Sequence, residues 1–297
     1  PTEVASVNMA TGEFSMITDV NGHIYESIKM GKSVERYTKT KDGKDLQSWI
    51  IYPPDFDPAK KYPTLLYCKG GPQGSLGQGW SYRWNYQMMA ANGYIVVAVN
   101  RRGNSGFGSY WREQISGDYG GKNIQDYLDA IDDMAKEPYV DKDRLGAVGA
   151  SYGGYSVFYL AGMHSKRFKA FVSHCGVYNT IAEYGSTEEY WYPNKDYQGA
   201  PWDKPQPPGY NKFSPHTMID KWDTPILIIT GANDFRIPYS QSLEAFNSAQ
   251  LRGVPSRLLF FENETHWVTK PQNSVIWQKE FFAFLDEYLK QAVGSRQ

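Results

Sequence analysis

The sequence has no long apolar run and no excess of charge of either sign. Its apolar runs are short, as at 94–99, and none approaches the ~20 residues that a membrane-spanning helix needs. The 31 basic and 32 acidic residues are interspersed and give a net charge of -1, so the chain offers no electrostatic footprint for nucleic acid or an anionic membrane. We therefore expect no nucleic-acid partner and no membrane span.

Cysteine is scarce, and both cysteines, Cys68 and Cys175, come at the ends of runs that we expect to be buried strands. This favours ordinary packing over a disulfide or a catalytic thiol, and it leaves the redox compartment undefined. The phosphate-binding patterns G-x-G-x-x-G and G-x-x-x-x-G-K-[ST] are missing too, although glycine is frequent between Gly70 and Gly79. Without either pattern, these glycines indicate phosphate binding only weakly.

The length of 297 residues is near the upper limit of a single hydrophobic core, so we expect one large domain with a small appendage. Residues 1–30 have the pattern of short strands around Gly12 and Gly22 and carry too few apolar residues for a core. The sequence begins at Pro1 without a start methionine or signal peptide, and we interpret it as part of a longer protein. From about Lys32 onward the pattern is that of the large domain.

In the large domain, short runs rich in β-branched residues alternate with longer amphipathic segments. This alternation is typical of βαβ units, and strands that are apolar throughout must be covered on both faces. We therefore predict an α/β fold with a doubly wound, mainly parallel sheet, helices on both faces, and a ligand site at the carboxyl ends of the strands. The expected strands are 46–52, 64–68, 94–100, 145–150, 170–174, 225–230 and 257–261, and the expected helices are 121–136, 152–164, 240–252 and 273–290.

A serine lies where one expected strand meets the next helix. Gly149, Ser151 and Gly153 form the pattern G-x-S-x-G. Glycines on both sides remove the side chains that would collide in a tight strand-to-helix turn, and in such a turn the serine hydroxyl stands clear of the sheet edge. Ser151 is therefore the candidate nucleophile.

A serine hydroxyl needs a base to take its proton and an acid to hold that base. On this kind of sheet the chain order is serine, acid, histidine, each after a later strand. Of the five histidines, His266 follows a late strand and precedes the last helix, and we take it as the base. His174 and His216 remain as alternatives that are more simply explained as hydrogen-bonded structural groups.

The acid is expected in the loop after strand 225–230, where Asp234 lies. Glu262 and Glu264 are more simply interpreted as solvated loop charges, and Asp220 and Asp223 precede the strand. Asp234 is therefore the expected third member of a triad.

The attacked carbonyl becomes an oxyanion, which needs hydrogen-bond donors placed in advance. The backbone N–H of Tyr152, directly after the nucleophile, would supply one donor. The other is expected from the loop C-K-G-G-P at Cys68, where glycines let the backbone approach closely and Lys69 adds a cation. The alternative is that this loop is a plain turn.

Four motifs resemble those of the prolyl oligopeptidase family of serine peptidases. They are K-G-G-P at Lys69, N-R-R-G-N-S-G-F-G at Asn100, G-A-S-Y-G-G-Y at Gly149 and G-A-N-D-F-R-I-P at Gly231, with His266 downstream. The resemblance covers roughly residues 35–297. The segment that begins at His266, H-W-V-T-K-P-Q-N-S-V-I-W-Q-K-E-F-F-A-F-L, is similar to the ending of the bacterial dipeptidyl peptidase 5 and acylaminoacyl peptidase branch.

The resemblance implies an α/β-hydrolase fold, a triad of Ser151, Asp234 and His266, and a preceding β-propeller that screens substrates by size and, in dipeptidyl peptidases, binds the free amino terminus. Residues 1–30 would be the end of that propeller and a linker, and 31–297 the catalytic domain. Arg236 would bind the P2 carbonyl of the substrate, a surface salt bridge being the alternative, and Tyr152 would line the S1 pocket. A secreted or periplasmic location is favoured over a cytoplasmic one.

The sequence departs from the family at one position, because Lys69 stands where relatives carry Tyr or His. The second oxyanion donor is then either the Lys69 ammonium, which costs desolvation, or a backbone N–H such as that of Gly70.

The segment 183–222 is a long insertion rich in Tyr, Trp, Pro and Gly, and insertions of this length are usually functional. This insertion and the strand before it would supply an apolar S1 wall, with packing in the core as the alternative. The residues concerned are Tyr178, Tyr184, Tyr190 and Trp191.

Together these residues predict acyl transfer to water without a metal or cofactor. Ser151 would attack the carbonyl of an oligopeptide, His266 would pass the proton to the leaving amine, and Asp234 would steady the imidazolium. We expect a dipeptidyl-peptidase-like enzyme, with a carboxylesterase or thioesterase on the same fold, or a non-catalytic binding module, as alternatives. Without a propeller we expect poor dipeptide release and generic turnover of small activated esters.

Overall fold

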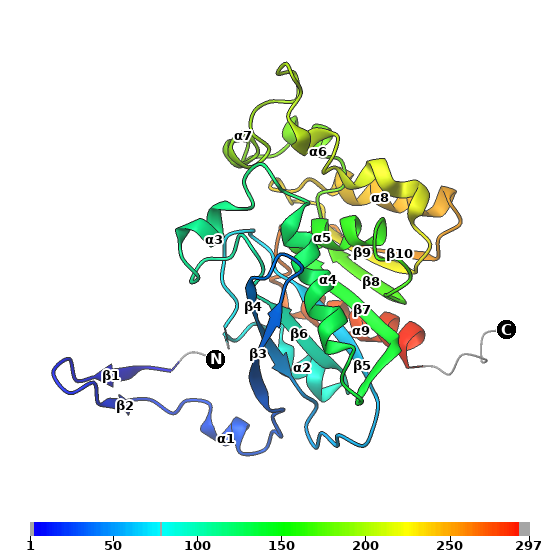
Figure 1. Cartoon of the computed structure of the whole chain (residues 1–297). Coiled ribbons are helices and arrows are strands. Elements are labelled where there is room, and N and C mark those ends of the chain that lie inside the picture. Colours follow the sequence, from blue (N-terminus) through cyan, green and yellow to red (C-terminus); the bar gives the residue numbers. More distant parts are fainter. Residues whose placement is uncertain (1–2, 78, 291–297) are drawn as a thin grey trace.

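An eight-stranded sheet and the helices that cover it form the body of the molecule (Figure 1). The computed structural model describes residues 3–77 and 79–290. The strands of the sheet are β3 (Ser33–Lys39), β4 (Asp45–Ile51), β5 (Tyr62–Cys68), β6 (Ile95–Val99), β7 (Val140–Ala150), β8 (Ala170–His174), β9 (Ile226–Gly231) and β10 (Ser256–Phe261). The longer helices are α2 (Tyr86–Ala91), α4 (Lys122–Met134), α5 (Tyr152–Ala161), α8 (Tyr239–Leu251) and α9 (Pro271–Leu289).

The strands lie in the order β10-β9-β8-β7-β5-β6-β4-β3. All neighbours from β10 to β6 pair in parallel, whereas β4 pairs antiparallel with both β6 and β3. The sheet is therefore mainly parallel, as the alternation of strand and helix segments predicts. Its carboxyl edge collects the loops that follow β5, β7, β9 and β10.

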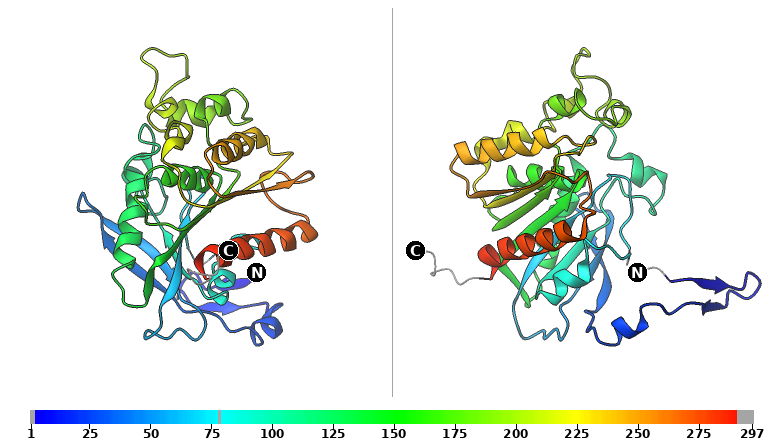
Figure 2. Two further views of the ribbon diagram at one scale, coloured as in Figure 1. Left: turned by 90° about the vertical axis from the view of Figure 1, so that its right-hand side faces the viewer. Right: turned by 180° about the vertical axis from the view of Figure 1, so that it is seen from behind.

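Helices cover both faces of the sheet (Figure 2), with α4, α5 and α8 on one face and α2 and α9 on the other. Each face of the sheet packs against its helices in one apolar cluster, and consecutive residues of a strand belong to opposite clusters. Ile228 packs with α4, α5 and α8, whereas Leu227 and Ile229 pack with α2 and α9. Every residue of β6, β8 and β9 is buried for this reason. Burial on both faces explains why these strands are mainly apolar rather than alternating.

Among the elements that were not expected from the sequence are a strand and a helix of the body. β3 lies at the sheet edge and is mostly polar, and Thr38 is the buried residue of this strand. α2 has six residues, too few for a clear helical period.

The insertion folds into short helices rather than an open loop, namely α6 (Thr180–Tyr184), α7 (Trp191–Asp196) and the 3-10 helices η1 (Pro208–Tyr210) and η2 (Pro215–Lys221). A further short helix, α3 (Ser109–Glu113), follows β6.

Residues 3–30 form an arm that extends away from the body (Figures 1 and 2). β1 (Ala5–Val7) pairs antiparallel with β2 (Phe14–Met16), and every residue of both strands is exposed. The hairpin includes Gly12 in the left-handed region, at φ 73°, where glycine is the least strained residue. Gly22 instead begins the short helix α1 (Gly22–Tyr25). Among the described residues, no helix is long and apolar enough to cross a membrane.

Candidate active site

Ser151 lies in a strained turn at the carboxyl edge of the sheet. β7 ends before it and α5 begins after it, and Ser151 itself has φ 61° and ψ -125°, which is unfavourable for a residue with a Cβ atom. The turn tolerates no bulk, because a Cβ on Gly153 would collide with the carbonyl oxygen of Cys68, and one on Gly149 would meet that oxygen at 2.7 Å. The glycines of the motif therefore let β7, α5 and the loop after β5 pack closely around the serine.

His266 and Asp234 form a buried hydrogen-bonded pair. Asp234 follows β9 and His266 follows β10, and these two strands are neighbours. His266 Nδ1 lies 2.8 Å from Asp234 Oδ2, while Asp234 Oδ1 accepts hydrogen bonds from the backbone N–H groups of Arg236 and Ile237. Both carboxylate oxygens of Asp234 therefore have hydrogen-bond partners, and the contact with Nδ1 fixes the orientation of the His266 ring.

The Cys175 thiol is a second neighbour of the His266 ring, and the sequence gives no signal of this contact. Cys175 is buried, as expected, but its Sγ lies 4.0 Å from His266 Nε2. Burial lowers the pKa of His266, whereas Cys175 and the Asp234 carboxylate raise it, and the net direction is above the ordinary value. The neutral imidazole that can accept a proton is therefore populated toward alkaline pH.

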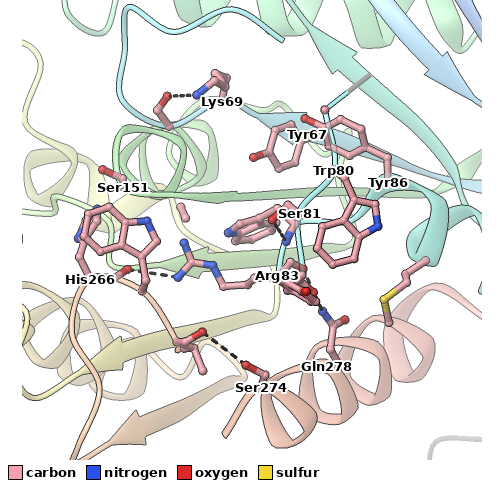
Figure 3. Close-up of a pocket in the computed structure, with 18 of the residues that line it drawn as sticks. Tyr67, Lys69, Trp80, Ser81, Arg83, Tyr86, Ser151, His266, Ser274 and Gln278 are labelled. Carbon is pink, nitrogen blue, oxygen red and sulfur yellow. Dashed lines mark hydrogen bonds between the residues drawn. The ribbon is translucent and has the colours of Figure 1, made fainter. Parts of the chain in front are cut away.

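Ser151 and His266 line the same cavity, which has a volume of about 1360 Å³ (Figure 3). The described residues contain no hydrogen bond between the two side chains. In unliganded enzymes such catalytic contacts are often long and tighten when substrate binds. A nucleophile and its base must reach the same substrate, and Ser151 and His266 meet this requirement because they line one cavity.

The two alternative histidines occupy structural positions. His174 Nδ1 accepts a hydrogen bond from Trp277 Nε1 and is fully buried. His216 Nδ1 lies 2.6 Å from Ser214 Oγ. Neither histidine lines the cavities that reach Ser151, so both are the hydrogen-bonded groups that the sequence interpretation allowed.

Glu264 corrects an expectation, because it is not a solvated charge. Its side chain is only 1% exposed and accepts hydrogen bonds from the backbone N–H groups of Thr269 and Lys270 and from Asn273 Nδ2. Its backbone carbonyl also accepts from the N–H of Asn233. Glu264 therefore ties the His266 loop to the start of α9 and to the Asp234 loop. Glu262 is exposed, as expected.

Two backbone N–H groups next to Ser151 are the candidates for the predicted oxyanion donors. The N–H of Tyr152 opens α5, where no helical carbonyl can pair with it. Gly70 lies against the nucleophile, since a Cβ on it would be 3.4 Å from Ser151 Cβ, and its N–H has no partner among the described residues. The N–H of Lys69 is already bonded to Tyr127 Oη.

The Lys69 side chain is turned toward the backbone of its own loop, and Nζ donates to the carbonyl of Gly70 at 2.8 Å (Figure 3). Burial, together with the nearby Arg101 cation, lowers the pKa of Lys69. Of the two donors left open by the sequence, the geometry therefore favours the N–H of Gly70 over the Lys69 ammonium.

Arg101 is a buried cation that sequence reasoning did not assign. Its guanidinium lies 4.5 Å from the centre of the Tyr152 ring and donates from Nη1 to the carbonyl of Pro72 and from Nε to Tyr127 Oη. It thus connects the loop after β5 with the residue that follows the nucleophile. Arg101 is the second residue of the motif N-R-R-G-N-S-G-F-G, so this motif was the sequence feature that could have pointed to it.

A second cavity, of about 340 Å³, also reaches Ser151. Its aromatic and apolar lining comes from Tyr119, Tyr152, Val177, Trp191 and Tyr192, and its charged lining from Glu189, Lys195, Asp196 and Arg236. Tyr152, which the resemblance assigns to the S1 pocket, is among these lining residues. Tyr119 and Tyr192 were missed because they come from the loop before α4 and from α7, which the sequence alone does not bring together.

Of the four residues expected to form the S1 wall, only Trp191 lines this cavity. Tyr178 is buried in the core against Phe158 and Trp222, because its neighbour Val177 takes the cavity side of the chain. Tyr184 packs its ring against Trp202 and Tyr210, and Tyr190 is 63% exposed. For Tyr178 and Tyr184 the packing alternative therefore applies.

Arg236 lines both cavities, at the point where they meet Ser151. Its guanidinium is paired with Glu189 at 2.9 Å and lies 4.9 Å from the centre of the Trp267 ring. Arg236 therefore forms the salt bridge given as the alternative and lines the cavities that reach Ser151, and its contact with a P2 carbonyl stays a prediction.

The donor atoms of Cys175, Asp234 and His266 lie within 4.8 Å of one another and could in principle hold a metal ion. The Asp234 carboxylate is already bonded to the imidazole and to two backbone N–H groups. These side chains therefore fit a hydrogen-bonded catalytic unit better than a metal centre.

Comparison with known proteins agrees with this geometry. Residues 80–292 match the model of the prolyl oligopeptidase family. Dipeptidyl-peptidase 5 of Porphyromonas gingivalis is 50% identical over 292 residues, which are 98% of this chain and 43% of that protein. Dipeptidyl-peptidase 5 of Schizosaccharomyces pombe is 38% identical over 250 residues, which are 84% of this chain and 36% of that protein.

Among solved structures, the acylaminoacyl peptidase of Pyrococcus horikoshii matches with a TM-score of 0.87 and 27% identity, over 97% of this chain and 46% of that one. The chain thus spans less than half the length of these relatives. The shared architecture is the α/β-hydrolase fold. On the match of its sequence and on this fold, the chain belongs to the prolyl oligopeptidase family.

Proposed function

We propose that the chain is the catalytic part of a serine peptidase that hydrolyses oligopeptides and, in the protein of natural length, releases dipeptides. One observation carries the proposal: Ser151 in its strained turn and His266, whose ring is hydrogen-bonded to Asp234, line a single cavity. The relatives named dipeptidyl-peptidase 5 support the substrate class.

The reaction follows from the placement of these groups. Ser151 Oγ attacks the peptide carbonyl while His266 Nε2 takes its proton, and His266 then gives the proton to the leaving amine. Asp234 holds Nδ1–H and stabilises the imidazolium. The N–H groups of Tyr152 and Gly70 would bind the oxyanion. Water then attacks the acyl-enzyme with His266 as base, and no metal or cofactor takes part in these steps.

The two cavities would receive the two halves of the substrate. His266 must reach the leaving nitrogen, so the leaving segment lies in the cavity that His266 lines, which we call the leaving-side cavity. The smaller cavity, which we call the acyl-side cavity, offers Tyr152, Val177 and Tyr192 to the P1 side chain. Arg236, at the junction, would reach the P2 carbonyl once its salt bridge with Glu189 rearranges.

A β-propeller is the proposed partner of the catalytic domain, with residues 3–30 as its end. The arm supports this, because a two-stranded hairpin is at best marginally stable alone and this one exposes apolar side chains such as Phe14 and Met16. Relatives more than twice as long as this chain support it as well. Such a domain would screen substrates by size and bind their amino terminus.

Labelling with a serine-directed fluorophosphonate tests the chemistry. We expect covalent labelling of the wild-type protein and none of Ser151→Ala, whereas a binding module would not be labelled. Turnover of blocked and unblocked dipeptide amides by the protein of natural length then tests the substrate class. An esterase or thioesterase would ignore these amides. Dipeptide release by the isolated 297-residue chain as efficient as by the natural-length protein would contradict the role given to the propeller.

A further inference from the structure

The two cavities differ in the sign of the charges that line them. The leaving-side cavity is lined by the cations Lys69, Arg83, Arg236 and Lys279, and no Asp or Glu of the described residues lines it. The acyl-side cavity carries the carboxylates Glu189 and Asp196 beside its cations. A cavity with cations alone favours an anionic group of the substrate.

Arg83 is a cation of the leaving-side cavity that is hydrogen-bonded to the residue of the catalytic base. Figure 3 shows its side chain extended toward His266. Arg83 Nη1 donates to the backbone carbonyl of His266 at 3.2 Å and lies 3.4 Å from His174 Nδ1. The loop that carries Arg83 is held by Gln278, whose Nε2 donates to the carbonyl of Arg83. The guanidinium is therefore fixed beside the proton donor.

Among the described residues Arg83 forms no salt bridge, although, against the lowering effect of burial, the more distant Asp234 carboxylate raises its pKa slightly. No Asp or Glu of the described residues lies within ion-pair distance of it, and its Nε and Nη2 donors have no hydrogen-bond partner there. Burial lowers the pKa of Arg83, which reflects the cost of keeping this charge away from water. Three other arginines of the body, Arg36, Arg102 and Arg167, each have a carboxylate, as buried cations usually do. Arg101 resembles Arg83 instead, because it is fully buried and forms no salt bridge with the described residues.

Arg83 uses only Nη1 to hold the His266 loop. Its Nε and Nη2 donors are therefore available to a ligand. The carbonyl that Arg83 contacts belongs to the same residue as the imidazole that protonates the leaving amine. A short chain therefore separates the leaving nitrogen from the guanidinium, since each extended residue adds about 3.3–3.6 Å. An anion at that distance would be the end of a very short leaving segment.

We propose that Arg83 binds the free C-terminal carboxylate of a leaving segment of one or two residues, so that the enzyme favours tri- and tetrapeptides that end in a free carboxylate. This inference rests on the peptidase function proposed above. The guanidinium would make charge-assisted hydrogen bonds with the carboxylate, of the kind that arginine forms well.

The test compares a tripeptide and a tetrapeptide, each as the free acid and as the C-terminal amide, on the protein of natural length at low salt. We expect the wild-type protein to cleave the acid with a kcat/KM about tenfold or more above that of the amide, because a hydrogen bond to a charged group is worth about 1.5–3 kcal/mol. Arg83→Met should bring this ratio close to one, and Arg83→Lys should keep part of it. Arg112→Met, an exposed arginine away from both cavities, should leave the ratio unchanged.

The ratio separates this role from damage to the triad, since acid and amide react through the same Ser151 and His266. Equal rates for acid and amide in the wild-type protein, or an unchanged ratio in Arg83→Met, would overturn the inference alone. Failure of the wild-type protein to cleave any of the four peptides would overturn the peptidase function and the inference with it. The wild-type comparison decides the matter even if Arg83→Met does not fold.

Discussion

The carboxyl edge of the sheet and the N-terminal arm use their side chains in opposite ways. At the edge, Asp234, Glu264 and His266 are polar groups buried by the body, and each has fixed hydrogen-bond partners. In the arm, apolar residues such as Phe14 and Met16 face solvent without a core behind them. The difference teaches that the buried polar groups of the edge have their hydrogen-bond partners within this chain, whereas the apolar side chains of the arm have no core behind them among the described residues.

Asp234→Asn should have the largest effect on the edge. The amide would leave His266 without its negative partner and favour the wrong tautomer, so we expect kcat to fall by about 10⁴-fold while the fold is kept. Steady-state hydrolysis of an activated ester measures this. Asp220→Asn, at an exposed position, is the matched control, and similar rates for the two variants would remove Asp234 from the triad.

Gly153→Ala should destabilise the protein by overpacking the serine turn at the edge. The new methyl group would collide with the carbonyl of Cys68, and overpacking of this kind costs about 1–3 kcal/mol. Urea denaturation would report the loss of unfolding free energy. Gly185→Ala is the control, because the nearest atom to its added Cβ is 3.8 Å away. Equal stability of the two variants would show that the turn can relax.

Glu264→Gln tests whether the buried loop charge stabilises the edge. Burial raises the pKa of Glu264, whereas its hydrogen bonds with Thr269, Asn273 and Lys270 lower it. The hydrogen bonds have the larger combined effect, so the folded-state pKa lies below the ordinary value. The stabilisation is therefore present above the unfolded-state pKa and is lost as the pH falls through the folded-state pKa.

At neutral pH we expect Glu264→Gln to lose about 1–3 kcal/mol of unfolding free energy, and the difference from the wild-type protein to shrink in acid. Thermal unfolding across a pH series measures both effects. The exposed Glu262→Gln should be nearly neutral at every pH. A constant gap between Glu264→Gln and the wild-type protein down to strongly acidic pH would contradict the charge assignment.

Cys175→Ala should shift the pH dependence of catalysis. The pKa of His266 is raised in part by Cys175, and the active form is the neutral imidazole, so activity rises as the pH increases through this pKa. Removing the thiol should move the acidic limb of kcat/KM to lower pH. Cys68→Ala, which changes a thiol away from His266, should leave the limb in place. An unmoved limb in Cys175→Ala would show that the contact does not tune the base.

Removal of residues 1–30 should have the smallest effect. The arm adds little to the body beyond exposed contacts such as the ion pair of Lys29 with Asp55, and surface ion pairs contribute about 0–1 kcal/mol. We expect the unfolding free energy of 31–297 to stay within about 1 kcal/mol of that of the whole chain. A large loss of stability would mean that the arm belongs to the catalytic domain.

The sequence predicted those parts of the site that depend on local pattern and chain order. Glycine spacing around Ser151 indicated the turn, and the order of strands singled out Asp234 and His266. Of the aromatic residues that line the acyl-side cavity, it named Tyr152 and Trp191 but missed Tyr119 and Tyr192. It also wrongly placed Tyr178 in this wall, because Tyr178 and Val177 are adjacent in sequence and face opposite ways. It also misassigned Glu264, since a carboxylate in a polar loop looks solvated until the helix that it caps is in place.

The sequence by itself determined the fold class, the strained serine turn and the separation of an arm from a body, because backbone sterics and the period of apolar residues act over a few neighbouring positions. Only the tertiary structure decided which groups meet: the thiol of Cys175 with the catalytic ring, Arg101 with the oxyanion loop, and the unpaired Arg83 with the leaving-side cavity. Such contacts join loops far apart in the chain, and burial and charge act through space.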